Sequence, residues 1–558
     1  MKTVKEICLG VAVAGVVVGA GTTVACAVAS ADTGTDGGNS ATTARSAGPS
    51  KASATRQATR VRPVAPASVA SSSRSVPAAA ASRVVARNSA ALRPFSTAPS
   101  TPVSLLSALP VLPAAPAPAS AQRTASPAAA VTASAVGGGP TKVLLIGTDG
   151  TNLSKVLANS ANTGFFNLMS QSVTGATSLV GHTTISGPSW TTILTGVWDT
   201  KSGVINNIFN PAPYDKWPTV FNQLEAYNSN INTSIVADWQ YLNDLADAGA
   251  YPVDNNFSYG FTDSWAATDA QVVAKTIDLI NATAADSSSF IFSYQVQVDE
   301  AGHSFGGGSQ EYAEAVTNVS NNIQAITNAV NAYNFGKPAD QQWSIIVTTD
   351  HGHQQQVGFG HGFQSPDETS SFVIFDQAGA NSNDGRQNLA YSTVDITPTI
   401  VSLFGAPARS DFDGVSLTTL ASSIVSAANS NAAPGGALSQ TLTDAINSFG
   451  YPDIGTDIKL GIRTIAGAVP YFINVALTSV VDSLTSIAAQ DTFLVSQLAG
   501  VTAVIVGLIG GAVVDATQAV AQVIGYLTGA GTIAPSDPPL SSVPSADAVL
   551  AAGALPVL

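Results

Sequence analysis

Five short apolar runs, separated by helical patterns, most strongly constrain the fold of this chain. The first has four apolar residues in a row and ends in Asp149-Gly150, as a buried parallel strand does where its carboxyl end carries function. The runs lie at 142–150, 234–237, 290–298, 344–348 and 372–375. The clearest helix has apolar residues at alternating spacings of four and three from Tyr312 to Tyr333. Alternating strands and helices predict an α/β fold with an open, mostly parallel sheet, in which ligands bind beyond the carboxyl ends of the strands.

Acidic and histidine residues cluster at three of these predicted strand ends. Four of the five histidines of the chain lie at or just after the strands. Carboxylate and imidazole are the ligands of zinc and similar divalent ions, and two such ions can clamp the attacking and leaving oxygens of a phosphoryl transfer. The pattern predicts a metal centre. The clusters are Asp149, then Asp299 with His303, then Asp350 with His351, followed by His361.

A small-residue loop, Ser186-Gly187-Pro188-Ser189-Trp190, precedes a predicted helix. Pro188 suits the first turn, where a missing N–H costs nothing. The Ser186 hydroxyl would then lie beside free backbone donors and a positive helix end, which suits a nucleophile that attacks an anionic centre. By itself such a loop is more typical of a helix cap.

Charge excludes one class of partner. The whole chain has a formal net charge of −14, and its first 140 residues have a net charge of +9. Residues 141–558 therefore have a net charge of −23 and contain only ten Lys and Arg residues. A polyanion such as nucleic acid is therefore disfavoured as a partner. A phosphate substrate would need metal ions for neutralisation.

The amino-terminal region predicts export. Residues 1–31 have Lys2 and Lys5, an apolar stretch and a terminal Ala29-Ser30-Ala31, which is typical of a signal peptide. A lipoprotein signal ending at Cys26 is disfavoured because Thr23 stands where a large aliphatic residue is expected. Both cysteines fall within this leader, so the mature protein would have no disulfide. Residues 32–140, rich in Ala, Ser and Pro, predict a disordered linker.

The motifs and their order resemble the alkaline phosphatase superfamily, with the closest match in its type I phosphodiesterase/nucleotide pyrophosphatase branch. The resemblance covers about residues 141–422. It is carried by Asp149-Gly150, the Ser186 loop ending in Thr195-Gly196, Val298-Asp299-Glu300-Ala301-Gly302-His303, Thr349-Asp350-His351-Gly352, Gly360-His361-Gly362, Val394-Asp395-Ile396-Thr397-Pro398-Thr399 and Phe412-Asp413-Gly414-Val415-Ser416-Leu417.

The resemblance implies a role for each matched residue. Ser186 would be the nucleophile, although a Thr is usual in this branch, and Asn207 would contact a phosphoryl oxygen, with Asn206 as the alternative. Two divalent ions, expected to be zinc, would be held by two sets of ligands. These are Asp299, His303 and His361 for one ion, and Asp149, Asp350 and His351 for the other.

The implied activity is hydrolysis of a phosphodiester or pyrophosphate bond through a phosphoseryl intermediate, on a small-molecule or lipid-like substrate. A sulfatase is disfavoured because Trp190 occupies the position of the motif's Arg. A phosphomonoesterase is disfavoured because no Arg lies between Pro140 and Gly385. Phosphonate hydrolysis and a non-catalytic envelope binding protein stay as alternatives. His353 is expected at the surface, with a partner of the metal ligands as the alternative. His182 is expected in a structural role, with contact to substrate as the alternative.

Residues 423–558 predict an apolar, Ala- and Val-rich helical region. Residues 494–514 form an uncharged stretch long enough to span a bilayer. We favour a helical bundle packed on itself or on the catalytic domain over a membrane anchor, and a guide for a lipid-like substrate is a third possibility. The expected location is outside the cytoplasm, secreted or associated with the cell envelope.

Overall fold

The computed structural model describes residues 139–358, 360–425, 430–490 and 495–533. Nine strands form one mixed sheet in the order β4-β3-β5-β1-β6-β7-β2-β8-β9. The five neighbours from β4 to β6 run parallel, β7 is antiparallel to both β6 and β2, and β9 is antiparallel to β8. The strands are β1 (Lys142–Thr148), β2 (Val173–Ser178), β3 (Asn232–Ala237), β4 (Asn255–Ser258), β5 (Ser289–Gln295), β6 (Trp343–Thr348), β7 (Ser370–Asp376), β8 (Arg386–Asn388) and β9 (Ile424–Val425).

Strand β1 lies at the centre of the parallel part and is buried on both faces. Its register pairs Leu145 with Phe292 of β5 and with Ile346 of β6. Successive β1 side chains enter opposite cores, with Val143 and Leu145 in one and Leu144 and Ile146 in the other. Because neither face meets water, the strand is continuously apolar rather than alternating.

Helices cover both faces of the sheet. One core is closed by α4 (Ser186–Thr195), α7 (Val220–Tyr227), α8 (Gln240–Asp247) and α13 (Ile396–Leu403). The other is closed by α2 (Leu153–Ala158), α3 (Thr163–Ser170), α9 (Trp265–Ala282), α10 (Gln297–Phe305), α11 (Gln310–Asn334) and α14 (Ala437–Ser448). Short helices α5 (Asp199–Ser202), α6 (Ala212–Lys216) and α12 (Pro366–Thr369) and the 3₁₀ turns at 339–341, 381–383, 393–395 and 417–423 complete the connections.

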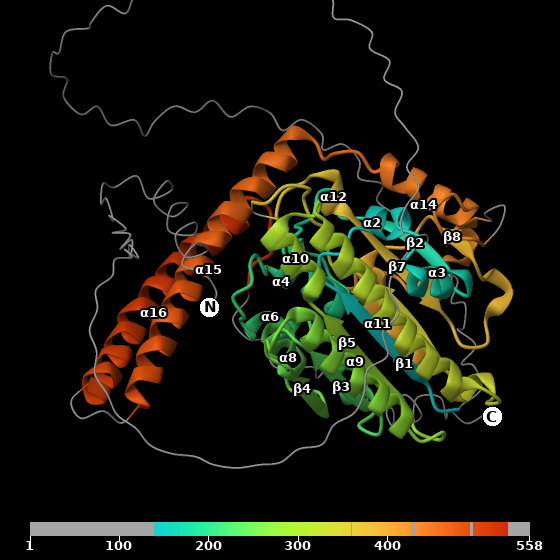
Figure 1. Cartoon of the computed structure of the whole chain (residues 1–558), viewed down its shortest axis with the longest axis horizontal. Helices are drawn as coiled ribbons and strands as arrows, with labels where there is room; N and C mark the ends of the chain where they lie inside the picture. The colour runs from blue at the N-terminus through green and yellow to red at the C-terminus, as the bar shows by residue number, and fades with distance from the viewer. Residues whose placement is uncertain (1–138, 359, 426–429, 491–494, 534–558) are drawn as a thin grey trace, which may run out of the picture. The chain divides into compact units, whose positions relative to one another are not determined.

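Two long apolar helices follow, α15 (Ile454–Ala488) and α16 (Val495–Leu527), and they pack along each other (Figure 1). They are antiparallel, since Gly500 faces Ala488, Gly507 faces Val481 and Gly510 faces Leu477. We call this pair the C-terminal hairpin. The start of α15 and the end of α16 contact the sheet domain, in agreement with the predicted packing on the catalytic domain. Large apolar side chains further along the hairpin, such as Leu498 and Leu508, are about 70% exposed.

The predicted α/β fold with a mostly parallel sheet is confirmed. All five predicted strands are present as β1, β3, β5, β6 and β7, and the helix expected around Tyr312 is α11. The short strands β2, β4, β8 and β9 were not predicted. The expected boundary after residue 422 falls just before β9, which pairs with β8, and before α14, which packs on the sheet. The predicted signal peptide and almost all of the predicted linker lie outside the described residues.

Candidate active site

Three neighbouring parallel strands bring the predicted ligands to one edge of the sheet. β5, β1 and β6 are adjacent, and their carboxyl ends lead directly to α10 with Asp299, to Asp149 and to Asp350. Because parallel strands end at the same edge, residues about 150 and 200 positions apart in the chain come together there. Gly150 N–H donates to Asp350 Oδ1 at 3.2 Å, which ties two of these ends to each other.

One half of the site surrounds Asp299. Its Oδ2 lies 3.1 Å from Nε2 of His303, one turn later on α10, and its Oδ1 lies 3.6 Å from Nε2 of His361. The two histidine Nε2 atoms are 3.1 Å apart. The structure therefore brings together all three residues that the sequence assigned to one metal ion.

The other half surrounds His351. Its Nε2 lies 3.2 Å from Asp350 Oδ2, 3.6 Å from Asp149 Oδ1 and 3.0 Å from Ser186 Oγ. These four residues are buried. The second predicted ligand set and the predicted nucleophile thus share one small space.

Ser186 is the first residue of α4, so the segment predicted as a loop before the helix is itself helical, while Pro188 lies in the first turn as predicted. The next residue, Gly187, donates its N–H to Asn207 Oδ1 at 2.7 Å. A Cβ on Gly187 would lie 2.6 Å from the backbone oxygen of Asn206, so glycine permits this close approach. Asn206 itself turns away, because its amide donates to the backbone oxygen of Gly467 at 3.0 Å. Of the two candidates, Asn207 lies beside the nucleophile.

Backbone carbonyls fix the orientation of two buried histidines. Nδ1 of His351 pairs with the oxygen of Gly352 at 2.9 Å, and Nδ1 of His361 pairs with the oxygen of Thr184 at 2.8 Å. A carbonyl only accepts, so each Nδ1 carries the proton and each Nε2 presents a lone pair to the carboxylates. This is the arrangement that orients metal-binding imidazoles in proteins.

Burial and mutual charge determine the protonation of the site. Burial lowers the pKa of His351 to about 4 and the pKa of His361 well below its usual range, so both rings are neutral, which is the form that binds metal. Burial raises the pKa of Asp149 to about 7, with the charge of Asp299 adding to the rise. Burial also raises the pKa of Asp350. For Asp299, the opposing effect of His303 and His361 outweighs burial and holds its pKa well below the usual range.

Several buried ligand atoms here have no hydrogen-bond partner among the described residues. They are Asp149 Oδ1, Asp299 Oδ1, Asp350 Oδ2 and His353 Nε2. Buried polar atoms are normally satisfied, and three clustered carboxylates repel one another without a cation. Within groups of three, the possible donor atoms lie within 4.8 Å of one another, as for Asp149, Asp350 and His351. The donor set therefore fits divalent metal ions.

The surface position expected for His353 is wrong. Its side chain is fully buried, and its Nε2 lies 3.8 Å from Asp299 Oδ1. With Asp299 and His303 it forms one of the groups that can hold a metal ion. The polar residues around it in the sequence concealed this position, because they belong to a loop that folds back over α10.

Two aromatic residues that orient Asp149 were missed. Trp190 Nε1 donates to Asp149 Oδ2 at 2.9 Å, and the Tyr294 hydroxyl donates to the same oxygen. Trp190 stands one helical turn after Ser186, a spacing that places it on the same side of α4. Tyr294 has no such local signal, since it reaches the site through the pairing of β5 with β1.

His182 is bound within the loop before α4, in agreement with the structural role expected for it. Its Nδ1 lies 3.0 Å from Asp199 Oδ1, and its ring stacks on Trp198 with centroids 3.7 Å apart. Asp199 also pairs with Arg463 at 2.5 Å. This network links the loop to the C-terminal hairpin.

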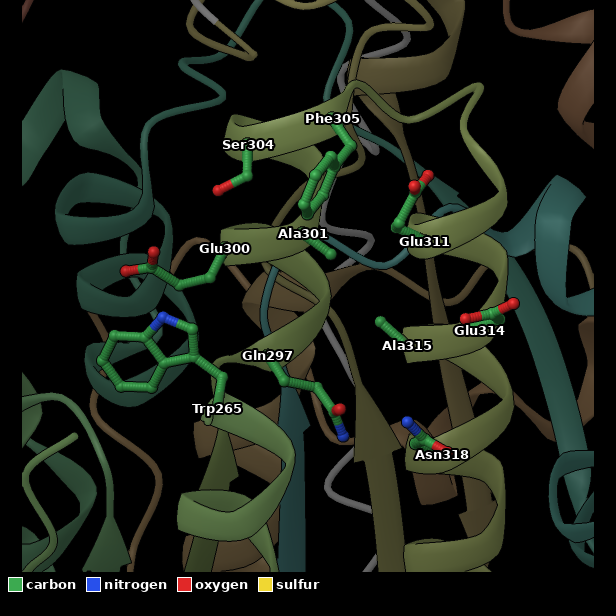
Figure 2. A pocket seen from close by; sticks show the side chains of 10 residues that line it. All are labelled: Trp265, Gln297, Glu300, Ala301, Ser304, Phe305, Glu311, Glu314, Ala315 and Asn318. Carbon is green, nitrogen blue, oxygen red and sulfur yellow. The ribbon is translucent and has the colours of Figure 1, made fainter. Parts of the chain in front are cut away.

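A separate groove of about 220 Å³ lies between α10 and the neighbouring helices α9 and α11 (Figure 2). Trp265, Glu300 and Phe305 are among its lining residues. Gln297 and Ala301 of the groove lie two residues to either side of Asp299, about 160° from it around α10, so this part of the groove faces away from Asp299. The groove is therefore outside the candidate metal centre.

Comparison with known proteins finds one matching family model and several solved structures of similar fold. Residues 143–364 match the family model of type I phosphodiesterase / nucleotide pyrophosphatase. None of the curated proteins matches the sequence. Among solved structures, an inactive variant of murine ectonucleotide pyrophosphatase/phosphodiesterase 5 in complex with AMP is 14% identical over 51% of this chain and 100% of that chain, with a TM-score of 0.40. A 2-O glycosaminoglycan sulfatase is 14% identical over 50% of this chain and 74% of that chain, with a TM-score of 0.40.

The matched region contains Ser186, Asn207 and all six predicted metal ligands. Over residues 143–364, the chain is therefore similar to type I phosphodiesterase / nucleotide pyrophosphatase, as the resemblance of its motifs predicted.

Proposed function

We propose that this protein is an exported, metal-dependent hydrolase that cleaves a phosphodiester or pyrophosphate bond with Ser186 as its nucleophile. The match of residues 143–364 to the family model supports phosphodiester hydrolysis. The observation that carries the proposal is the 3.0 Å contact of Ser186 Oγ with His351 Nε2, within a buried group that includes Asp149 and Asp350. A hydroxyl beside a metal-binding group is the arrangement that an activated nucleophile requires.

Two zinc ions are the cofactors that we propose. Asp299, His303 and His361 would hold one, and Asp149, Asp350 and His351 would hold the other. Such ions lower the pKa of a bound hydroxyl and neutralise charge on phosphoryl and leaving oxygens. They would also replace basic side chains, since residues 141–558 have only ten Lys and Arg.

The residues around the phosphorus have distinct tasks in this proposal. Ser186 Oγ attacks phosphorus in line with the leaving oxygen and forms a phosphoseryl intermediate, which water then hydrolyses. Asn207 uses Oδ1 to accept the Gly187 N–H, so its amide N–H group is left to donate to a phosphoryl oxygen. The amino-terminal end of α4 adds a positive field at Ser186.

Diesters are favoured over monoesters and sulfate esters. Arg463 is the one arginine of the hairpin, and its guanidinium binds Asp199 and the oxygen of Thr528 rather than pointing to substrate. Trp190, at the position of the sulfatase Arg, is buried against Asp149. Neither residue offers a cation to a doubly charged phosphate or to a sulfate.

The test uses the purified chain with a nitrophenyl phosphodiester, the corresponding monoester and the sulfate, with and without a chelator. Faster turnover of the diester, lost on chelation and restored by zinc, is the expected result. Faster turnover of the monoester or sulfate would overturn the diester proposal. Binding of metal without turnover of any ester would favour the non-catalytic alternative.

A further inference from the structure

The C-terminal hairpin is built into one side of the candidate active site. Arg463 of α15 forms a buried ion pair with Asp199, which holds the loop before α4 through His182. Its guanidinium also donates to the oxygen of Thr528, just after α16, at 2.7 Å. The neighbouring Thr464 donates its hydroxyl to the backbone oxygen of Gly362, next to His361. The base of the hairpin thus holds two loops of the site.

A second set of contacts reaches the loop that carries Asn207. Asn206 donates to the oxygen of Gly467 at 3.0 Å and to Oε1 of Gln518 at 2.7 Å, so it contacts both helices of the hairpin. The hairpin base therefore contacts the loops that carry Asn207 and His361.

Beyond this base, each helix continues as a free arm, residues 472–488 of α15 and 498–517 of α16. At 1.5 Å per residue the arms are about 26 and 30 Å long, comparable to the hydrocarbon core of a bilayer. Their only charged residues are Asp482 and Asp515, and Asp515 lies close to the base, three residues before Gln518. Exposed apolar side chains include Val475, Val480, Leu498, Val504, Leu508 and Ile509.

The arms do not behave as core helices of a soluble domain. In the most apolar 18-residue window of each helix only 17% is buried within the described chain. Exposed apolar surface of this extent marks an interaction site. Both helices also lie far from the amino terminus, so neither is a signal sequence.

Charge decides which partner covers the arms. A second copy of the chain would bring another folded region with a net charge of −23, and the same two aspartates, to the interface, so the two copies would repel each other. An anionic lipid surface would repel the protein for the same reason. Uncharged hydrocarbon beneath zwitterionic headgroups matches apolar arms without this repulsion. An anchored hairpin would hold the site at the membrane surface, because its base is part of that site.

We infer that the hairpin arms insert into a zwitterionic lipid surface and that the substrate is a phosphodiester of a glycerophospholipid in that surface. The inference rests on the proposed function and names its substrate class. Water adds across one P–O bond of the lipid, giving a phosphomonoester and an alcohol whose oxygen takes the proton. The hairpin base positions the site over the headgroups, and the arms stay in the lipid.

The experiment uses the full chain with vesicles of phosphatidylcholine and phosphatidylethanolamine. Flotation measures binding, product release measures lipid hydrolysis, and a soluble nitrophenyl diester measures the chemistry alone. The test variant is Leu498→Glu with Leu508→Glu, at positions 69% and 72% exposed. The matched control is Phe335→Glu with Leu389→Glu, at positions on the sheet domain that are 88% and 61% exposed.

We expect the parent and the control to float with the vesicles and to hydrolyse their lipid. The hairpin variant should lose at least about tenfold in both measurements and keep the parent rate on the soluble diester. Three outcomes overturn the inference: a parent that does not float, a parent that floats but hydrolyses only the soluble diester, or a parent dimer in solution that the hairpin variant dissociates. If the parent does not hydrolyse the soluble diester, the proposed function is rejected, whatever the flotation shows.

Discussion

The Ser186 hydroxyl oxygen lies 3.0 Å from Nε2 of His351, although 165 residues separate them in the chain. The Nδ1–H of His351 is donated to the carbonyl of Gly352, so Nε2 has a lone pair and accepts from the serine. Replacing Ser186 with Ala removes the nucleophile and leaves the buried ligands in place. We expect kcat on a nitrophenyl phosphodiester to fall by a factor on the order of 10³ or more, with zinc content unchanged.

The control for that measurement is Ser189→Ala, one helical turn further along α4, whose hydroxyl donates to the oxygen of Thr183. This variant should keep activity within about threefold of the parent, since only one neutral hydrogen bond is lost. Equal activity of Ser186→Ala and the parent would reject Ser186 as nucleophile.

Asn207→Ala tests phosphoryl recognition. Loss of a donor to a developing negative charge typically lowers kcat by about 10²- to 10³-fold. The comparison is Asn210→Ala, an exposed residue whose Oδ1 accepts from Ala212 N–H. Equal effects of the two substitutions on kcat would show that Asn207 has no special role at phosphorus.

Removal of metal should lower both activity and stability. A ligand present at 1,000 times its Kd stabilises the folded state by about 4 kcal/mol, so chelation should lower Tm and abolish diester hydrolysis together. Titration with zinc should restore both with a stoichiometry of two per chain. A restored activity at one zinc per chain would contradict the two-ion proposal.

Arg463→Met leaves the carboxylate of Asp199 buried without its cation. Arg463 is 4% and Asp199 1% exposed. Breaking a buried pair on one side typically lowers the free energy of unfolding by about 3–5 kcal/mol. Urea unfolding of the variant should show this loss, and Asp199→Asn combined with Arg463→Met should recover part of it. Unchanged unfolding would mean that the hairpin base is not held by this pair.

Glu225 predicts a pH dependence of stability. Burial raises its pKa to about 7 from an ordinary value of 4.5. The folded state therefore binds this proton more tightly than the unfolded state does. The contribution of the protonated Glu225 to the free energy of unfolding is complete below pH 4.5 and is lost as pH rises through 7. Glu225→Gln retains an acceptor for the Thr233 hydroxyl, which donates to Oε1 at 2.6 Å. The variant should raise Tm at pH 8 and not at pH 4.5; a larger gain at pH 4.5 would contradict the assignment.

Much of the site could be predicted because its parts are local in sequence. Four consecutive apolar residues predict strand β1, and Asp149 follows at its carboxyl end. Since parallel strands share an edge, the pattern of strand ends was enough to predict that Asp149, Asp299 and Asp350 meet. The sequence alone therefore determined the fold class and predicted which acidic residues would meet at the sheet edge.

Other contacts depend on how distant segments pack. Tyr294 reaches Asp149 only through the register of β5 against β1, and His353 is buried only because its loop folds back over α10. No local periodicity carries this information. The short strands β4 and β9 escaped prediction for the same reason, since four and two residues are too few to show a period.

The C-terminal helices show the same division most clearly. Their composition predicted that they are apolar and helical, because they are long segments rich in Ala and other apolar residues, with few charges and no Pro between residues 494 and 514. Only the tertiary structure decided that Arg463 pairs with Asp199 and that Asn206 contacts Gly467 and Gln518, about 260 and 310 residues away. These residues are far apart in the sequence, so no local pattern predicts their contacts. They meet only because the hairpin base packs against the edge of the site.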